Sequence, residues 1–378
     1  WKPAEEAGFD AVVGNPPYLN AWSMTNETTD LRSVIESLSP NAQLLEGHWD
    51  LYVAFIIQAI NSLRVGGYHS FIVPDAFARE KYARSARKYI LEKLSLPEIM
   101  HFEGLNVFDD VSRHCIIYVL SNKANPTDQE TKVVTPISDL IVSVEELGSV
   151  PQSEWINSDS CQIRFNLANR KIQKIIKKLS SNCLKLGQFC YVMVGATTHS
   201  KDKKSFTKDT IVSAEPKGNA KRFFDGRNVS RYHINWDGRY IDYRRDEMYG
   251  PRVPELFESD KVVVRDITGE NERLIVSLDH DGMYCDHLVT CVTYYENVAG
   301  TGVQTAFEGF QRSNPPYPDL AYITALLASQ VMTWYFRQLF ATSTLQGSYS
   351  HTYPQQVRAF PIRRIAFTTP AGERERLV

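Results

Sequence analysis

The chain has 378 residues, of which 43% are apolar and 11% aromatic, enough for two packed domains. Its formal net charge is −2, so any contact with a nucleic acid must come from a local basic patch. The longest nearly apolar run, residues 51–60, is too short to cross a bilayer, and no charged-then-apolar leader opens the sequence, so no membrane contact is expected. The scattered cysteines, without a Cys-x-x-Cys motif, are typical of reduced thiols in a cytoplasmic protein.

The first predicted element is a buried strand that ends in a rigid, polar turn. Residues 9–13 form a short apolar run, and Gly14-Asn15-Pro16-Pro17-Tyr18 follows directly. Consecutive prolines exclude both helix and ladder, and the carboxyl edge of an open α/β sheet is where ligands bind. The side-chain oxygen of Asn15 and the carbonyl of Pro16 can each accept one N–H of an exocyclic amine, while Tyr18 stacks on the ring that carries it. An ordinary turn is the alternative, since Asn and Pro form turns in any protein.

Residues 9–18 resemble motif IV of the amino-methyltransferases, in the Asn-Pro-Pro-Tyr form of TaqI-like N6-adenine DNA methyltransferases. That group includes fused type II (type IIG) restriction–modification enzymes and phage-defence methylases. The resemblance implies that Asn15, Pro16, Pro17 and Tyr18 are catalytic and that S-adenosylmethionine donates the methyl group. Glutamine-N5 methyltransferases that act on release factors share the tetrapeptide, but the second half of the chain argues against them.

The next segments predict a strand–helix–strand unit. Residues 48–63 have helical spacing and are followed by Gly66-Gly67, a C-cap signal, and by a strand over 68–73. Such a unit requires a parallel pair of strands. The block is similar to motifs V and VI of the family, in which Asp50 borders the adenine pocket; an ordinary helix N-cap is the alternative for Asp50.

A basic amphipathic helix with a solvated face is expected over residues 76–94, with phosphate contact as the alternative, followed by strands over 98–102 and 115–120. Between these strands, Phe108 matches the aromatic residue of motif VIII. The resemblance implies that Phe108 stacks on a flipped base opposite Tyr18. Burial in the core is the alternative for this residue.

No glycine loop for S-adenosylmethionine precedes residue 9. The one candidate, Gly300-Thr301-Gly302, would demand a permuted order, and a lone Gly-x-Gly is a weak signal. The chain also opens with Trp1, close to the catalytic strand. We therefore expect the cofactor-binding half to lie upstream, in a longer parent protein.

Residues 123–160 are rich in turn formers and predict a connector, and a helix is expected over 166–179. Residues 199–245 then hold twelve Lys or Arg against six Asp or Glu, with aromatic residues among them. Such a patch suits duplex DNA, although a solvated loop is the alternative. The predicted DNA-binding residues are Lys203, Lys204, Lys221, Arg222, Arg227, Asn228, Arg231, Arg244 and Arg245.

Residues 221–232 resemble the Gly-x-Asn/Asp-Ile-x-x-Tyr segment of TaqI-like target-recognition domains. Three later segments are also similar to that domain: 254–266, 322–336 and 347–362. The resemblance therefore extends over nearly the whole chain, with specific motifs in the first half and diffuse ones in the second.

Two further motifs have simpler explanations. Asn314-Pro315-Pro316-Tyr317 repeats the tetrapeptide, but polar residues precede it and Asp319 opens a helix, which predicts a pre-helix loop. The acidic and histidine residues over 279–287 match no common zinc spacing, and their Asp-Gly turn predicts a hairpin instead of a metal site.

The sequence thus predicts an α/β fold: a partial Rossmann-like methyltransferase sheet followed by a mixed α+β target-recognition domain. The expected parts are a catalytic-pocket region over 1–122, the connector over 123–160 and the recognition domain over 161–378. The expected reaction is site-specific methylation of N6 of an adenine flipped from double-stranded DNA, with the isolated chain inactive. The alternatives are a DNA-binding specificity module without activity, or an amino-methyltransferase that acts on RNA or protein.

Overall fold

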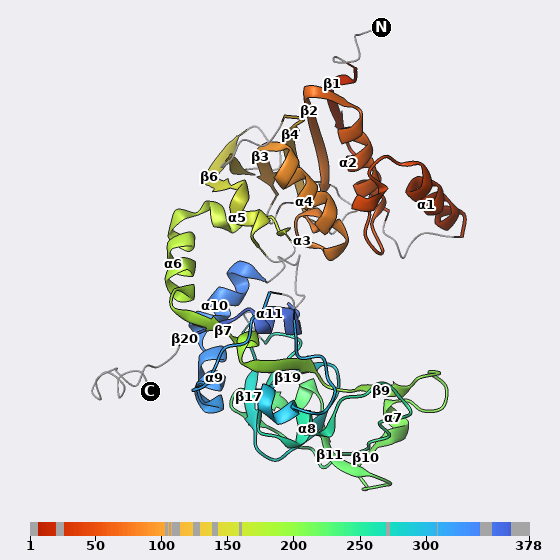
Figure 1. Cartoon of the computed structure of the whole chain (residues 1–378), viewed down its shortest axis with the longest axis vertical. Helices are drawn as coiled ribbons and strands as arrows, with labels where there is room; N and C mark the ends of the chain where they lie inside the picture. The colour runs from red at the N-terminus through yellow and green to blue at the C-terminus, as the bar shows by residue number, and fades with distance from the viewer. Residues whose placement is uncertain are drawn as a thin grey trace, which may run out of the picture. The chain divides into compact units, whose positions relative to one another are not determined.

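A computed structural model describes residues 7–19, 26–102, 105, 107, 114–123, 129–137, 143–158, 161–269, 273–307, 309–340 and 350–363, with backbone only for 26–30. The chain divides into two compact units, residues 1–175 and 176–378 (Figure 1). No helix among the described residues is both long and apolar enough to cross a membrane.

The first unit is built on a six-stranded mixed sheet in the order β1-β2-β4-β3-β5-β6. β1 pairs with β2, and β3 with β5, in parallel; the other neighbours are antiparallel. The strands are β1 (Phe9–Gly14), β2 (Leu63–Pro74), β3 (Ser95–His101), β4 (Cys115–Ser121), β5 (Glu130–Pro136) and β6 (Val144–Pro151). The helices are α1 (Asn26–Leu38), α2 (Leu51–Asn61), α3 (Ala76–Arg79), α4 (Arg84–Lys93) and α5 (Gln152–Ile156).

The predicted strand–helix–strand unit is confirmed, because α2 connects two parallel neighbours, β1 and β2. The prediction that Gly66-Gly67 caps the helix is wrong: α2 ends at Asn61, and both glycines lie inside β2. A Cβ on Gly67 would lie 2.8 Å from the carbonyl oxygen of Phe9. Glycine is required here because the two strand backbones approach each other closely.

The predicted helix over 76–94 is interrupted, and its face is only partly solvated. α3 and α4 are separated by a 3-10 turn, and Arg87 is completely buried. Its Nη1 donates to the carbonyl oxygens of Phe77 (2.7 Å) and Glu80 (2.8 Å), and its Nε donates to that of Cys161 (3.0 Å). Burial lowers the pKa of Arg87 to about 10. The guanidinium group stays buried because backbone carbonyl groups beside the helix break accept its N–H groups.

The segment predicted as a connector supplies β5 and β6 to the same sheet. Val133 and Val134 of β5 are buried, and the Thr131 hydroxyl donates to the Leu96 carbonyl at 2.6 Å. Prolines and short polar residues around these strands hid their alternation in the sequence. The boundaries at 122 and 160 stay predictions.

The second unit is centred on an antiparallel sheet in the order β17-β16-β19-β8. Val263 of β16 belongs to one hydrophobic core, whereas Val262 and Val264 belong to another, so both faces of this sheet are covered. Its strands are β17 (Val276–Asp279), β16 (Lys261–Arg265), β19 (Val289–Tyr294) and β8 (Cys190–Val194).

Smaller sheets and short helices complete the second unit. One core contains the second four-stranded sheet, β10-β14-β11-β18, and the other contains the helices near the C-terminal end. The remaining strands are β7 (Cys183–Lys185), β9 (Thr197–Ser200), β10 (Val212–Ser213), β11 (Ala220–Phe224), β12 (Val229–Ser230), β13 (His233–Ile234), β14 (Tyr240–Asp242), β15 (Met248–Gly250), β18 (Tyr284–Cys285) and β20 (Pro361–Arg363). The helices are α6 (Arg170–Ser180), which crosses the unit boundary, α7 (Lys208–Ile211), α8 (Pro254–Glu258), α9 (Leu320–Leu327), α10 (Gln330–Leu339) and α11 (Pro354–Arg358).

The hairpin predicted over 279–287 is wrong. The strand after the turn, β18, pairs in parallel with β11 and not with β17. The carboxylate of Asp279 forms a buried ion pair with Lys261 and accepts hydrogen bonds from the backbone N–H groups of Asp281 (2.9 Å) and Met283 (3.1 Å). These bonds hold the turn in a shape that directs the chain away from β17.

His69 is a buried titratable residue in the first unit. It lies in β2, with its ring 4.2 Å from that of Phe71 and 5.3 Å from that of Tyr118. Neither ring nitrogen has a hydrogen-bond partner in the part of the chain that the structure describes. Burial lowers the pKa of His69 from 6.5 to about 3, so the ring is neutral in the folded protein.

Acid should therefore destabilise the first unit through His69. Below pH 6.5 the His69 ring binds a proton in the unfolded chain but not in the folded chain. The free energy of unfolding therefore falls as the pH drops toward 3. Between pH 7 and pH 5 this amounts to about 2 kcal/mol. The variant His69→Phe should remove that part of the pH dependence in urea unfolding, whereas His48→Phe, at an exposed histidine of the same unit, should keep it. Equal pH dependence in the wild type and in His69→Phe would contradict this account.

Candidate functional site

The turn Asn15-Pro16-Pro17-Tyr18 leaves β1 at the edge of the first sheet where β2 also ends. Asn15 and Pro17 are exposed, Pro16 is buried and Tyr18 is partly buried. The backbone N–H of Leu51, at the start of α2, donates to the carbonyl of Leu19 at 2.9 Å. The turn is therefore anchored at both ends, with the Asn15 side chain open to solvent.

Tyr18 is held in one orientation by its hydroxyl group. It donates to the carbonyl of Ile72 in β2 at 3.0 Å, and the thiol of Cys115 is a further partner. Its ring lies edge-on to that of Tyr52, with the centroids 6.5 Å apart. Burial and the neighbouring Cys115 raise the pKa of Tyr18 well above its ordinary value. The phenol stays protonated, and its ring has a fixed direction.

Asp50 occupies the N-cap position of α2, but its side chain makes no capping bond. It is 6% exposed and accepts a hydrogen bond from the Tyr82 hydroxyl at 2.8 Å. The Tyr82 hydroxyl is in turn 2.8 Å from that of Tyr52. Because Tyr52 also contacts Tyr18, Asp50 belongs to a polar chain that extends toward the turn. Its place at the border of an adenine pocket stays a prediction.

Sequence reasoning missed several polar residues at the same edge. Asp75 follows β2 directly and forms an ion pair with Arg79, and its Oδ2 lies 3.9 Å from Nε2 of the buried His101. The start of β4 is also here, since Cys115 pairs with Pro74 in the strand register. An aspartate directly after a strand-ending proline was the available signal for Asp75. Phe108, the predicted second stacking ring, lies outside the described residues.

Eight of the nine predicted DNA-binding residues fall into three groups. Lys203, Lys204 and Arg245 are exposed, and no ion pair forms with them among the described residues. Other cations are paired across the surface: Lys221 with Glu258 (2.9 Å), Arg222 with Asp281 (3.7 Å), Arg227 with Asp225 (2.9 Å) and Arg244 with Asp242 (2.8 Å). Arg231 donates to the Ala328 carbonyl and lies 3.3 Å from the Tyr232 hydroxyl.

Asn228, the ninth predicted DNA-binding residue, is the buried one of the set, and both ends of its amide are used within the fold. It is 8% exposed, and its Nδ2 donates to the Asn235 carbonyl at 2.9 Å. Its Oδ1 accepts from the Asp225 N–H and from Arg239, both at 2.9 Å. A contact between this amide and a base would require these bonds to break.

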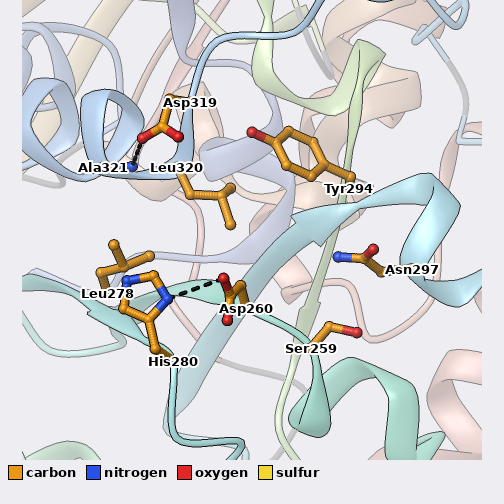
Figure 2. A pocket seen from close by; sticks show the side chains of 9 residues that line it. All are labelled: Ser259, Asp260, Leu278, His280, Tyr294, Asn297, Asp319, Leu320 and Ala321. Carbon is orange, nitrogen blue, oxygen red and sulfur yellow. Dashed lines mark hydrogen bonds and ion pairs between the residues drawn. The ribbon is translucent and has the colours of Figure 1, made fainter.

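A cavity of about 630 Å³ lies in the second unit beside the start of α9 (Figure 2). Nδ1 of His280 lies 3.0 Å from the Asp260 carboxylate on one side, and Asp319 caps α9 on the other. His280 belongs to the stretch 279–287, whose acidic and histidine residues match no common zinc spacing. Its acidic neighbours Asp279 and Asp281 pair instead with Lys261 and Arg222, so these side chains diverge. The described residues contain no group of three or more metal-capable side chains.

The second Asn-Pro-Pro-Tyr tetrapeptide lies in a loop before α9, as predicted, and Asp319 is the N-cap of that helix. The Tyr317 ring is stacked between those of Phe189 (5.6 Å) and Tyr294 (5.7 Å). This tetrapeptide therefore packs within the second unit, without a strand directly before it.

Two family models match the chain. Residues 1–108 match the Eco57I restriction-modification methylase, and residues 221–362 match the TaqI-like C-terminal specificity domain. The chain is 21% identical over 95% of its length to a putative type II restriction enzyme and methyltransferase of Methanocaldococcus jannaschii, RM.MjaORFECS2P, and covers 27% of that protein. It is 26% identical over 46% of its length to the Type II methyltransferase M.HincII of Haemophilus influenzae, and covers 34% of it.

Among solved structures, the Type IIL restriction-modification enzyme MmeI in complex with DNA has a TM-score of 0.52 to this chain at 11% identity. The match covers 92% of this chain and 46% of MmeI. At this identity the likeness concerns the fold alone, and it confirms the predicted α/β class with a methyltransferase-like part and a recognition part. The chain spans about a quarter to a third of the length of the two curated relatives. Residues 1–108 are thus similar to part of an Eco57I restriction-modification methylase and residues 221–362 to a TaqI-like specificity domain, and both curated relatives are type II methyltransferases or restriction enzymes with a methyltransferase.

Proposed function

We propose that this chain contributes the base pocket and the DNA reader of a site-specific adenine-N6 DNA methyltransferase of a restriction–modification or defence system. The observation that carries the proposal is the anchored Asn15–Tyr18 turn, within the segment that matches the methylase model. The substrate is an adenine flipped out of double-stranded DNA, and the protein acts in the cytoplasm. All six cysteines are free thiols, in keeping with that compartment.

In this proposal the residues of the turn orient the amine that is methylated. The Asn15 side-chain oxygen and the Pro16 carbonyl accept its two N–H groups, which frees the nitrogen lone pair from the ring for attack. Tyr18 and Phe108 hold the base between two rings, an arrangement worth ~1–3 kcal/mol per stacked face. Methylation of this nitrogen would release one amine proton, which would pass to solvent. No strong general base is needed.

S-adenosylmethionine would supply the electrophilic methyl group. The described residues do not offer the usual cradle for it, because Gly300-Thr301-Gly302 follows the 3-10 turn Tyr295–Val298 and the next α-helix begins only at Leu320. We therefore assign the cofactor-binding half to an upstream part of the parent protein. The second candidate function is a DNA-specificity module without activity of its own. It is favoured if residues 221–362, which match the specificity domain, are the functional part of this chain.

Replacing Asn15 by Ala in the parent protein should lower the methylation rate by roughly 100-fold or more, because one of the two amine acceptors is lost. DNA binding should persist, since Asn15 is exposed and lies in a different unit from the basic patch. The measurement is transfer of a labelled methyl group beside an equilibrium binding assay. Asn157→Ala, at another exposed asparagine of the same unit, is the control. Unchanged turnover in Asn15→Ala would favour the specificity module.

Calorimetric titration of this chain with S-adenosylmethionine, with and without duplex DNA, should give no binding heat in a folded sample. The reason is that the strand–glycine loop–helix cradle is assigned to the upstream half. Micromolar binding would contradict that assignment and point back to Gly300-Thr301-Gly302.

The double variant Lys203→Ala/Lys204→Ala should weaken binding to all duplexes alike. Each lost phosphate contact should reduce the slope of log K against log salt concentration by about 0.9, so the pair should reduce it by about 2. The control Lys177→Ala/Lys178→Ala removes the same charge from the exposed face of α6. Equal slopes in both double variants would remove Lys203 and Lys204 from the DNA interface, and tighter binding of RNA than of duplex DNA would favour an RNA substrate.

A further inference from the structure

A buried carboxylate organises three cations of the basic patch. Asp225 is 2% exposed and precedes the 3-10 turn Gly226–Asn228. Its Oδ1 accepts from the backbone N–H (3.1 Å) and Nε (3.2 Å) of Arg227, and its Oδ2 accepts from Nη2 of Arg227 (2.9 Å). Oδ2 also accepts from Lys208 (3.1 Å) and Arg239 (3.2 Å). Burial raises the pKa of Asp225, but the bonds from Arg227 and Lys208 outweigh it and hold this pKa below its usual range.

Two of the three cations have a second carboxylate of their own. Lys208 lies 2.6 Å from the buried Asp286, and Arg239 lies 2.7 Å from Asp237. Their side chains are 31% and 21% exposed, whereas the side chain of Arg227 is 82% exposed. Arg227 is therefore the member of the cluster that projects into solvent while its base is fixed.

The way Arg227 binds Asp225 leaves one edge of its guanidinium group open. The carboxylate occupies the side formed by Nε and Nη2. The end formed by Nη1 and the other N–H of Nη2 has no hydrogen-bond partner among the residues that the structure describes. This end presents two parallel donors in one plane, which match the O6 and N7 acceptors of a guanine in the major groove.

A phosphate group could also accept from two parallel donors. The ion pair with Asp225, however, offsets the positive charge that would attract a phosphate, and it restricts the side chain to one direction. The ion pair thus weakens the attraction of Arg227 for phosphate and fixes the direction of its donors. A fixed direction is useful for recognising a base edge, whereas phosphate contacts carry no sequence information.

We propose that Arg227 reads a guanine in the DNA target and that Asp225 is the positioning residue that aims it. The inference rests on the proposed binding of duplex DNA by the second unit. Asp225 is itself held in place, because its backbone N–H donates to Oδ1 of Asn228 and the amide of Asn228 is anchored on Asn235.

The test is selection from a randomised duplex library by the full chain. The wild type should enrich sequences with a guanine at one or more positions. Both Arg227→Lys and Asp225→Asn should reduce that preference by roughly tenfold or more, while binding to unselected duplexes changes little. Asp225→Asn should have no further effect on the preference in the Arg227→Lys background, which a merely structural role would not predict. Arg170→Lys and Glu92→Gln, at exposed positions outside the patch, are the matched controls.

A second arm replaces the selected guanine by 7-deazaguanine, which lacks the N7 acceptor. This change should weaken the wild type and leave Arg227→Lys unaffected. If the wild type binds no duplex, the proposed function itself fails. If it selects a sequence that Arg227→Lys selects equally well, or if Arg227→Ala weakens all duplexes equally, Arg227 contacts phosphate or nothing, and this inference is overturned. If Asp225→Asn fails to fold, Arg227→Lys decides, since it changes an exposed side chain.

Discussion

The parallel pairing of β1 with β2 is the constraint on which the candidate active site depends. Gly67 allows the two backbones to approach, and the register then brings the end of β1 beside the end of β2. In this arrangement the Tyr18 hydroxyl reaches the Ile72 carbonyl. The chemistry assigned to the turn thus depends on backbone contacts more than on any single polar side chain.

Much of this first unit was predictable from local signals. A short apolar run followed by two prolines marks the end of a strand, and the helix after it has clear periodicity. Gly66 and Gly67 were misassigned because glycine serves equally as a helix cap and as a point of close backbone approach. Arg87 was misassigned because a charged residue on a helix is normally solvated, and the carbonyl groups that retain it come from residues up to 74 positions away.

The site was predictable only where its residues are adjacent in sequence. The Asn15–Tyr18 turn is one continuous motif, whereas Asp75, His101 and Cys115 meet there through strand register. In the second unit, composition identified a basic patch, but it could not separate Arg227, which projects, from Asn228, which is buried one residue later. That distinction arises from the buried carboxylate of Asp225, which fixes the direction of Arg227. In a count of charges, Asp225 appears only as one negative charge among the cations.

The central sheet of the second unit has hydrophobic residues packed on both faces. Val262, Val263 and Val264 follow one another in β16, and each of them is buried. At any position of such a strand, burial of an unpaired polar side chain would lower the stability of the fold. The sheet therefore acts as a fixed frame, on which the connections between strands are held. In a protein of this design, substitutions in the loops can change the chemistry of the surface without any change in the packing of the core.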